Sequence, residues 1–121
     1  MDDQSNLKKI AKIIHPEVRI NMNNFIKKNK NKKIIVLDIP LLMENKINKK
    51  SDILVFIDAK KKEINKRLKK KLNYNPSVLK KFKKLQLPIE FKKKKSNFVI
   101  KNNFKNNSIK KSVKKILEKI L

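Results

Sequence analysis

Residues 33–44 have the sequence KIIVLDIPLLME, and this stretch decides the fold that the sequence predicts. Its apolar residues run without alternation up to Asp38, a pattern typical of a strand covered on both faces. Pro40 ends the strand because its nitrogen has no hydrogen to donate to a neighbouring strand. We therefore expect a strand at residues 34–39 that places the Asp38 carboxylate at the edge where parallel sheets bind their ligands.

Two further apolar runs predict strands, ILVFI at residues 53–57 and FVI at residues 98–100. Apolar residues with helical periodicity predict helices at residues 5–14, 16–28, 60–71, 76–85 and 108–121, with a further short helix that starts at Leu87-Pro88. Strands separated by helices indicate a mostly parallel sheet with helices on its faces. The predicted fold class is α/β with a sheet of three strands, which is a thin core.

Local signals predict where several helices begin. The pair His15-Pro16 predicts a break between the first two helices, because proline disfavours the helical conformation in the residue before it. Asn75 followed by proline predicts the start of a helix, since asparagine caps helices and proline suits their first turn. Ser108 is expected to cap the last helix.

The chain is strongly basic, with a formal net charge of +25 over 121 residues. Only Arg19 and Arg67 are arginines among its 35 basic residues. Recognition of phosphates and bases favours arginine, whose planar guanidinium bonds in pairs. We therefore interpret the lysine excess mainly as compositional drift on solvated faces, in a genome rich in A and T. Such a surface still attracts polyanions, so a basic nucleic-acid-binding protein is the alternative function.

The sequence contains no glycine, which excludes every glycine-rich phosphate loop within it. Turns that need a positive φ are expected to use asparagine, the next most tolerant residue. Asparagines do fall at the predicted breaks, at Asn29, Asn31, Asn45, Asn73, Asn103 and Asn107.

Other absences narrow the protein class. No cysteine is present, and a single histidine cannot build a zinc site. No apolar run approaches the roughly 20 residues of a membrane span, and the first residues lack a signal-peptide pattern. We expect a soluble cytoplasmic protein. Residues 108–121 also fit an interfacial membrane helix, although packing of this helix on the sheet is the favoured interpretation.

Several short motifs, in order and with their spacing, resemble the C-terminal two-thirds of the dephospho-coenzyme A kinase family. They are HPEVR (15–19), VLDIPLLMEN (36–45), ILVFIDA (53–59), KRL (66–68), QLPIE (86–90) and SNFVIKNN (96–103). The resemblance implies a P-loop kinase that moves the γ-phosphate of ATP, with Mg²⁺, to the 3′-hydroxyl of dephospho-coenzyme A. It also implies one partial kinase domain over residues 1–121, with a helical lid at residues 60–95.

The resemblance also indicates what the chain lacks. Members of the family begin with a strand, a phosphate loop and an acidic motif, and none of these is in this sequence. In the family fold that first strand lies between the strands that correspond to residues 34–39 and 53–57. We therefore expect an incomplete parallel sheet and no catalysis by this chain alone. Three explanations are open: the sequence is a fragment, its start is wrongly assigned, or the N-terminal part is separately encoded.

Site residues follow from the same resemblance. Arg67, Lys71 and Asn102 match ATP-side positions, although Lys71 stands where the family usually has arginine, and Lys101 replaces a usual aspartate. Pro40, Leu41, Leu42 and Glu44 match a motif on the acceptor side, where the leucines also fit a core role. Asp38 has a place from which it could reach Mg²⁺ through water. His15 and Pro16 match a family mark for which we favour a structural role.

Overall fold

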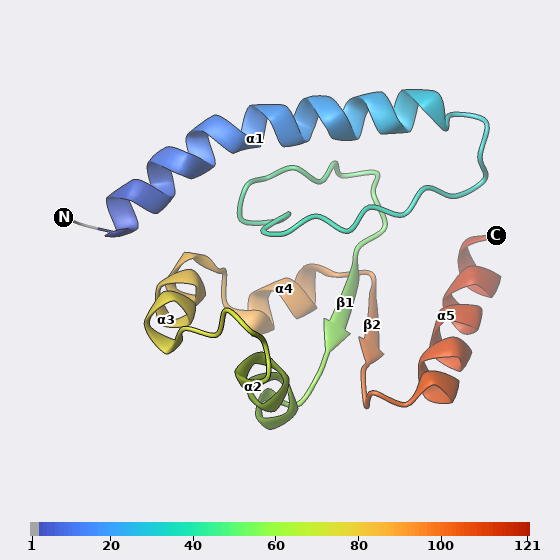
Figure 1. Ribbon diagram of the computed structural model, residues 1–121. Helices are drawn as coiled ribbons and strands as arrows, with labels where there is room; N and C mark the ends of the chain where they lie inside the picture. The colour runs from blue at the N-terminus through green and yellow to red at the C-terminus, as the bar shows by residue number, and fades with distance from the viewer. Residues whose placement is uncertain (1–2) are drawn as a thin grey trace. The chain divides into compact units, whose positions relative to one another are not determined.

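The computed structural model describes residues 3–121, and the side chains of residues 9, 12 and 15–121. The chain forms two compact units, Met1–Lys49 and Lys50–Leu121. Figure 1 shows the elements of both units along the chain. Their order is α1 (Asp3–Lys28), β1 (Val55–Asp58), α2 (Lys61–Lys69), α3 (Pro76–Leu85), α4 (Ile89–Lys95), β2 (Phe98–Lys101) and α5 (Asn106–Ile120).

The first unit consists of α1 and a long irregular segment. α1 continues through Pro16, so the predicted break between two helices is wrong. A proline inside a helix removes one backbone hydrogen bond, and α1 is continuous on both sides of Pro16 despite this loss. The axis of α1 changes direction along its length (Figure 1), as expected of a helix that contains proline. Ile47, 6% exposed, is the buried apolar residue of this unit's described side chains.

The predicted strand at residues 34–39 is also wrong. This segment is irregular, and its side chains alternate between exposed and half-buried, with Val36 81% exposed. A strand needs a neighbour to accept and donate its backbone hydrogen bonds. No part of residues 3–121 pairs with this segment as a strand, so its β-forming sequence does not produce a β-strand.

The second unit contains a parallel sheet of two strands in place of the three predicted. Its register pairs Val55 with Phe98 and Ile57 with Ile100. Asn97 fastens the start of the ladder: its side-chain Oδ1 accepts from the Leu54 N–H at 2.8 Å, and its N–H donates to the Leu54 oxygen at 2.8 Å. The fold is therefore α/β, as predicted, but with a smaller sheet.

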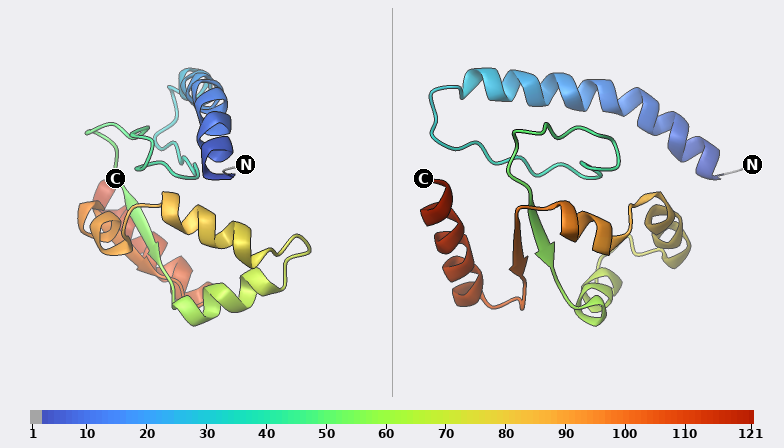
Figure 2. Two further views of the ribbon diagram at one scale, coloured as in Figure 1. Left: turned by 90° about the vertical axis from the view of Figure 1, so that its left-hand side faces the viewer. Right: turned by 180° about the vertical axis from the view of Figure 1, so that it is seen from behind.

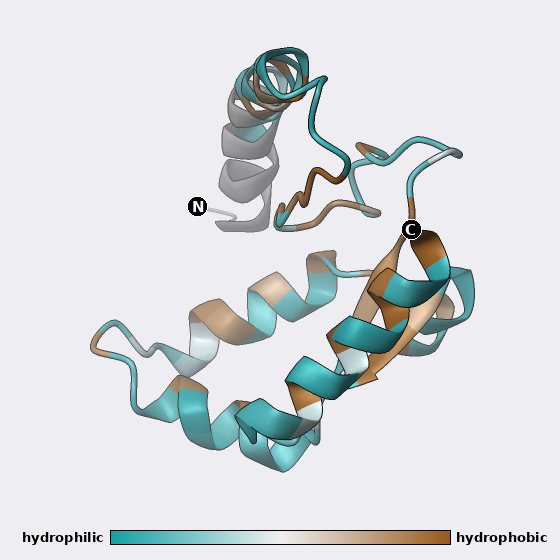
Figure 3. Ribbon diagram, turned by 90° about the vertical axis from the view of Figure 1, so that its right-hand side faces the viewer, coloured by the Kyte–Doolittle hydropathy of each residue, from teal (hydrophilic) through white to brown (hydrophobic). Residues whose placement is uncertain are grey.

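Helices lie on both sides of these strands (Figures 1 and 2). α5 packs against β2, as the favoured interpretation of its sequence predicted. Figure 3 shows the strands in brown, while α5 alternates between hydrophilic and hydrophobic segments. Ile100, 5% exposed, is the buried residue of the sheet. Residues 60–95 contain α2, α3 and α4, and their role as a lid remains a prediction.

The helix starts were predicted with mixed success. Asn75 caps α3 as predicted: its Oδ1 accepts from the N–H groups of Ser77 at 3.0 Å and Val78 at 3.3 Å. The Ser108 prediction is wrong, because α5 begins at Asn106, two residues earlier. The Ser108 hydroxyl instead accepts from the Asn103 side chain at 3.2 Å, so it supports the loop that precedes the helix.

Candidate functional site

A cleft lies where the two parallel strands end. Its volume is about 540 Å³, which is within the usual range of ligand pockets. The lining residues are the last residues of β1 and β2, the residues that follow them, and the first turn of α2: Asp58, Ala59, Lys60, Glu63, Lys101, Asn102, Asn103 and Phe104. The carboxyl ends of strands are where open α/β sheets bind their ligands, so this cleft is the candidate site of the second unit.

The loop after β2 is shaped by two asparagine side chains. The Asn102 N–H extends the ladder by donating to the Asp58 oxygen at 2.7 Å. The Asn102 Oδ1 then accepts from the Phe104 N–H at 2.9 Å, and the Asn103 Oδ1 accepts from the Lys105 N–H at 3.0 Å. Between these two turns Phe104 has a φ of 61°, in the left-handed region.

Asparagine does not take the positive φ values, contrary to the prediction. Among the described residues these fall on Leu41, Lys46 and Phe104. Phe104 directly follows Asn103, and Lys46 directly follows Asn45. In the loop after β2 the asparagines instead use their side chains to bond the backbone two residues on, which is their other common role in turns.

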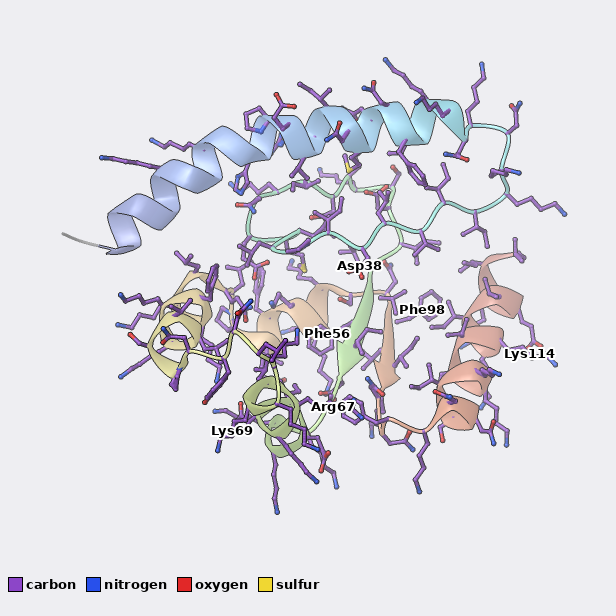
Figure 4. The ribbon with its side chains drawn as sticks, in the orientation of Figure 1. Asp38, Phe56, Arg67, Lys69, Phe98 and Lys114 are labelled. Carbon is purple, nitrogen blue, oxygen red and sulfur yellow. The ribbon has the colours of Figure 1, made fainter. Side chains whose placement is uncertain are left out.

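Arg67 lies near the end of the strands at which this cleft opens (Figure 4). It belongs to the last turn of α2, and its guanidinium carbon stands 3.8 Å from the centroid of the Phe104 ring. The structure thus brings Arg67 and Asn102, two of the predicted ATP-side residues, to one loop through Phe104. Phe104 itself was missed by sequence reasoning. The signal was available: it is a lone aromatic residue in the polar turn KNNFKNN.

Lys71 is not part of this cleft. It is exposed in the turn after α2, where its N–H donates to the Leu68 oxygen at 3.1 Å. The position of Lys71 outside the cleft gives no support to its predicted ATP-side role, which remains a prediction.

Asp58, one of the residues that line the cleft, makes an ion pair that the sequence analysis missed. The Lys93 ammonium of α4 donates to the Asp58 carboxylate at 3.0 Å, and both side chains are about one-third exposed, at 36% and 30%. The hydrogen bond to Asp58, with the carboxylate charge, raises the pKa of Lys93 above its ordinary value of 10.5. The pair fixes α4 to the end of β1 and neutralises a carboxylate that would repel an anionic ligand.

The predicted acceptor-side residues belong to the first unit and form a hydrogen-bonded turn. The Leu41 oxygen accepts from the Asn45 N–H at 3.1 Å, and the Leu42 oxygen accepts from the Ile47 N–H at 3.0 Å. Leu41 has a φ of 54°. The Arg19 guanidinium donates to the Asn45 oxygen at 2.9 Å, so the motif that contains His15 and Pro16 contacts the motif that contains Pro40 and Glu44.

The remaining predicted residues of this unit are placed as follows. Leu41, Leu42 and Glu44 are half-buried, which suits both a core role and a lining role. Asp38 is exposed at the end of the irregular segment. His15 is half-buried inside α1, where the continuous helix leaves no junction between helices for it to stabilise.

The residues present do not fit a metal site of their own. Over the described part of the chain, no three His, Cys, Asp or Glu side chains gather where they could hold an ion. Asp38 alone supplies one carboxylate, fewer ligands than a dedicated cation site needs.

Comparison with known proteins decides the family. The family described as dephospho-CoA kinase matches residues 1–110. The chain belongs to the dephospho-CoA kinase family. This match confirms the resemblance found in the motifs. Members of the family act in coenzyme A biosynthesis and use ATP.

Individual relatives agree with this assignment. The chain is 38% identical over 103 residues to the dephospho-CoA kinase of Fusobacterium nucleatum, a match that covers 84% of this chain and 52% of the relative. It is 31% identical over 102 residues to that of Wolbachia sp. subsp. Brugia malayi, with 83% and 52% covered. It is 34% identical over 98 residues to that of Bacillus anthracis, with 78% and 48% covered. The chain thus spans about half the length of the curated relatives it matches.

No helix among residues 3–121 has both the length and the hydropathy that crossing a bilayer requires.

Proposed function

We propose that this chain supplies the nucleotide-binding cleft of a dephospho-CoA kinase, which phosphorylates the 3′-hydroxyl of dephospho-coenzyme A with ATP. One observation carries the proposal. Asn102, predicted to lie near adenine, lines a cleft of about 540 Å³ where two parallel strands end, and Arg67, a cation predicted to contact ATP, stacks on the ring of Phe104, which lines the same cleft.

Each ATP-side residue has a distinct role in this proposal. Arg67 presents a planar, permanently charged group that suits the phosphates, which it can bond with two parallel hydrogen bonds. Asn102 uses its side-chain oxygen on the Phe104 N–H, so its contribution is to shape the loop beside the base. Lys71 is a secondary candidate that acts as a point charge from the turn after α2.

The first unit supplies the acceptor side in this proposal. The turn that contains Pro40, Leu41, Leu42 and Glu44 lies against the dephospho-coenzyme A substrate, with Glu44 orienting its polar groups. Asp38 is the acidic residue nearest in sequence and contributes charge there. Support for this assignment comes from the family motif that these residues match and from the hydrogen-bonded turn that they form.

Turnover is not expected from the 121-residue chain alone. Phosphoryl transfer depends almost entirely on positioning and on stabilisation of charge by fixed donors. Loss of one such donor lowers rates by about 10²- to 10³-fold, and this sequence, without glycine, has no glycine-rich phosphate loop. The chain should therefore bind ATP without transferring its phosphate. Formation of coenzyme A by the purified chain would contradict this expectation.

The binding half of the proposal is tested with ATP as the probe and Arg67→Ala as the variant. Loss of a charged hydrogen-bonding group should weaken ATP binding about tenfold, measured by calorimetry. Lys66→Ala is the matched control, because Lys66 neighbours Arg67, is also exposed and carries the same charge. Equal losses in the two variants would show that ATP responds only to the net positive charge, and the assignment of Arg67 would then be wrong.

Non-specific polyanion binding is the second candidate function, and the surface of α5 favours it. All the lysines of this helix are exposed: Lys110, Lys111, Lys114, Lys115 and Lys119. Lys114 lies on the side of the helix away from the strands (Figure 4). Binding of this kind should weaken steeply as salt rises and should show no sequence preference. Filter binding of single-stranded DNA over a salt series distinguishes it from nucleotide binding. Retention of DNA binding in Arg67→Ala would separate the two functions.

A further inference from the structure

Phe104 has an unusual backbone conformation for its residue type. Its φ of 61° lies in the left-handed region, which large side chains rarely occupy. The conformation is held from both sides, because Asn102 bonds the Phe104 N–H and Asn103 bonds the N–H of the next residue. A strained residue persists only where its surroundings hold it, and such residues are concentrated at binding sites. The held conformation of Phe104 therefore indicates a function for its ring.

The ring supports the only arginine of the second unit. The Arg67 guanidinium carbon is 3.8 Å from the ring centroid, so the cation lies over the face of the ring. Arg67 is otherwise exposed at the end of α2, where a long side chain would sample many rotamers. Contact with the ring restricts those rotamers and sets where the guanidinium stands relative to the cleft that Phe104 lines.

This contact is compatible with binding of an anion by the same arginine. All five N–H donors of a guanidinium lie in its plane, whereas a cation–π contact uses its face. Arg67 can therefore keep one face on Phe104 while its edge donates to phosphate oxygens. The ring lowers the conformational entropy that Arg67 loses on binding, which improves affinity without any contact between ring and phosphate.

We propose that Phe104 is a positioning residue, which holds the Arg67 guanidinium at the cleft for the phosphate groups of the nucleotide. The inference rests on the proposed nucleotide function and extends it to a residue outside the motifs that revealed the family. Lys101, the last residue of β2, contributes charge but no ring, so it cannot replace Phe104 in this role.

The contact itself is tested by NMR without any ligand. The chain has two arginines, so the Arg67 Nε–Hε signal is readily distinguished, with Arg19 of the first unit as an internal control. A proton over an aromatic ring is shifted upfield, and Phe104→Leu should move the Arg67 signal downfield while the Arg19 signal stays in place. Phe104→Tyr should keep the upfield position. If the Arg67 signal is the same in the leucine variant and the parent, the inference is overturned.

The positioning role is then tested by titrating the same samples with ATP. We expect Phe104→Leu to weaken the ATP-induced shift of Arg67 by about two- to fivefold in apparent affinity, and Phe104→Tyr to restore it. Phe104→Gly removes both the ring and the backbone strain. Under the positioning role it binds ATP as weakly as the leucine variant, whereas under a purely structural role it binds like the parent.

The outcomes separate this inference from the proposed function. If ATP shifts Arg67 equally in the parent and Phe104→Leu, the proposed function stands and the positioning role is wrong. If the upfield shift is present but ATP moves no Arg67 signal in any variant, nucleotide binding itself is wrong, and the inference fails with it.

Discussion

Truncation of Ile100 is the sharpest test of the sheet. Ile100 is 5% exposed and lies in register with Ile57, while Val99 beside it is 40% exposed. Ile100→Ala removes three buried carbon atoms, which at about 0.8 kcal/mol each gives about 2.4 kcal/mol. Incomplete collapse of the cavity adds to this, so we expect a loss of about 3 kcal/mol in the free energy of unfolding.

Val99→Ala is the matched control, because it removes a β-branched residue from the same strand. Its two lost carbon atoms are only about 60% buried by comparison, so the expected loss is about 1 kcal/mol. The assay is urea unfolding followed by circular dichroism, with the m-value checked for each variant. Ile100→Val, with an expected loss of about 1 kcal/mol, provides a milder change if the alanine variant does not fold.

The difference of about 2 kcal/mol between the two alanine variants is the decisive quantity. Equal losses would mean that the sheet does not bury Ile100 more deeply than Val99. The assignment of the β1–β2 pair as the core of the second unit would then be wrong.

Three further predictions follow from local features. Asn75→Ala should cost about 1 kcal/mol because the Ser77 and Val78 N–H groups lose their acceptor, whereas Asn75→Asp should be nearly neutral; urea unfolding measures both. Pro16→Ala should raise the helix content, and should raise the free energy of unfolding by up to about 3 kcal/mol, because α1 is continuous at this position. Circular dichroism measures the helix content, and no gain in it would favour the predicted break between two helices. The raised pKa of Lys93 means that its pairing with Asp58 stabilises the fold below pH 10.5 and that this contribution is lost as the pH rises through the folded-state value. Asp58→Asn should return the Lys93 titration, followed by NMR, towards 10.5; an unchanged titration would contradict the assignment of its cause.

Features set by neighbouring residues in the sequence were predictable. The cap of α3 depends on Asn75 and the residues that follow it within one turn, so the sequence contains the whole interaction. The positions of β1 and β2 were predicted to within about two residues for the same kind of reason, because each is a dense apolar run bounded by polar residues. Arg67 and Asn102 were found through motifs.

Features set by distant residues were not predictable. Phe104 takes its conformation from two asparagine side chains and its ring contact from α2, which precedes it by a whole strand and two helices. The Asp58–Lys93 pair joins residues 35 positions apart, and in a chain with so many lysines no pattern singles one of them out. Contacts of this kind depend on the fold rather than on local sequence, so they are visible only once the strands are paired.

The strand prediction at residues 34–39 and the exposed residues of β1 have one physical explanation. A continuous apolar run predicts an environment, namely cover on both faces, rather than a hydrogen-bonding partner. In β1 the run does pair, yet Val55 and Ile57 remain 41% and 54% exposed because two strands cover little area. At residues 34–39 the run has no strand partner among residues 3–121, so the segment stays irregular and Val36 is exposed. Both runs therefore have the composition of strands in a larger sheet than these residues form.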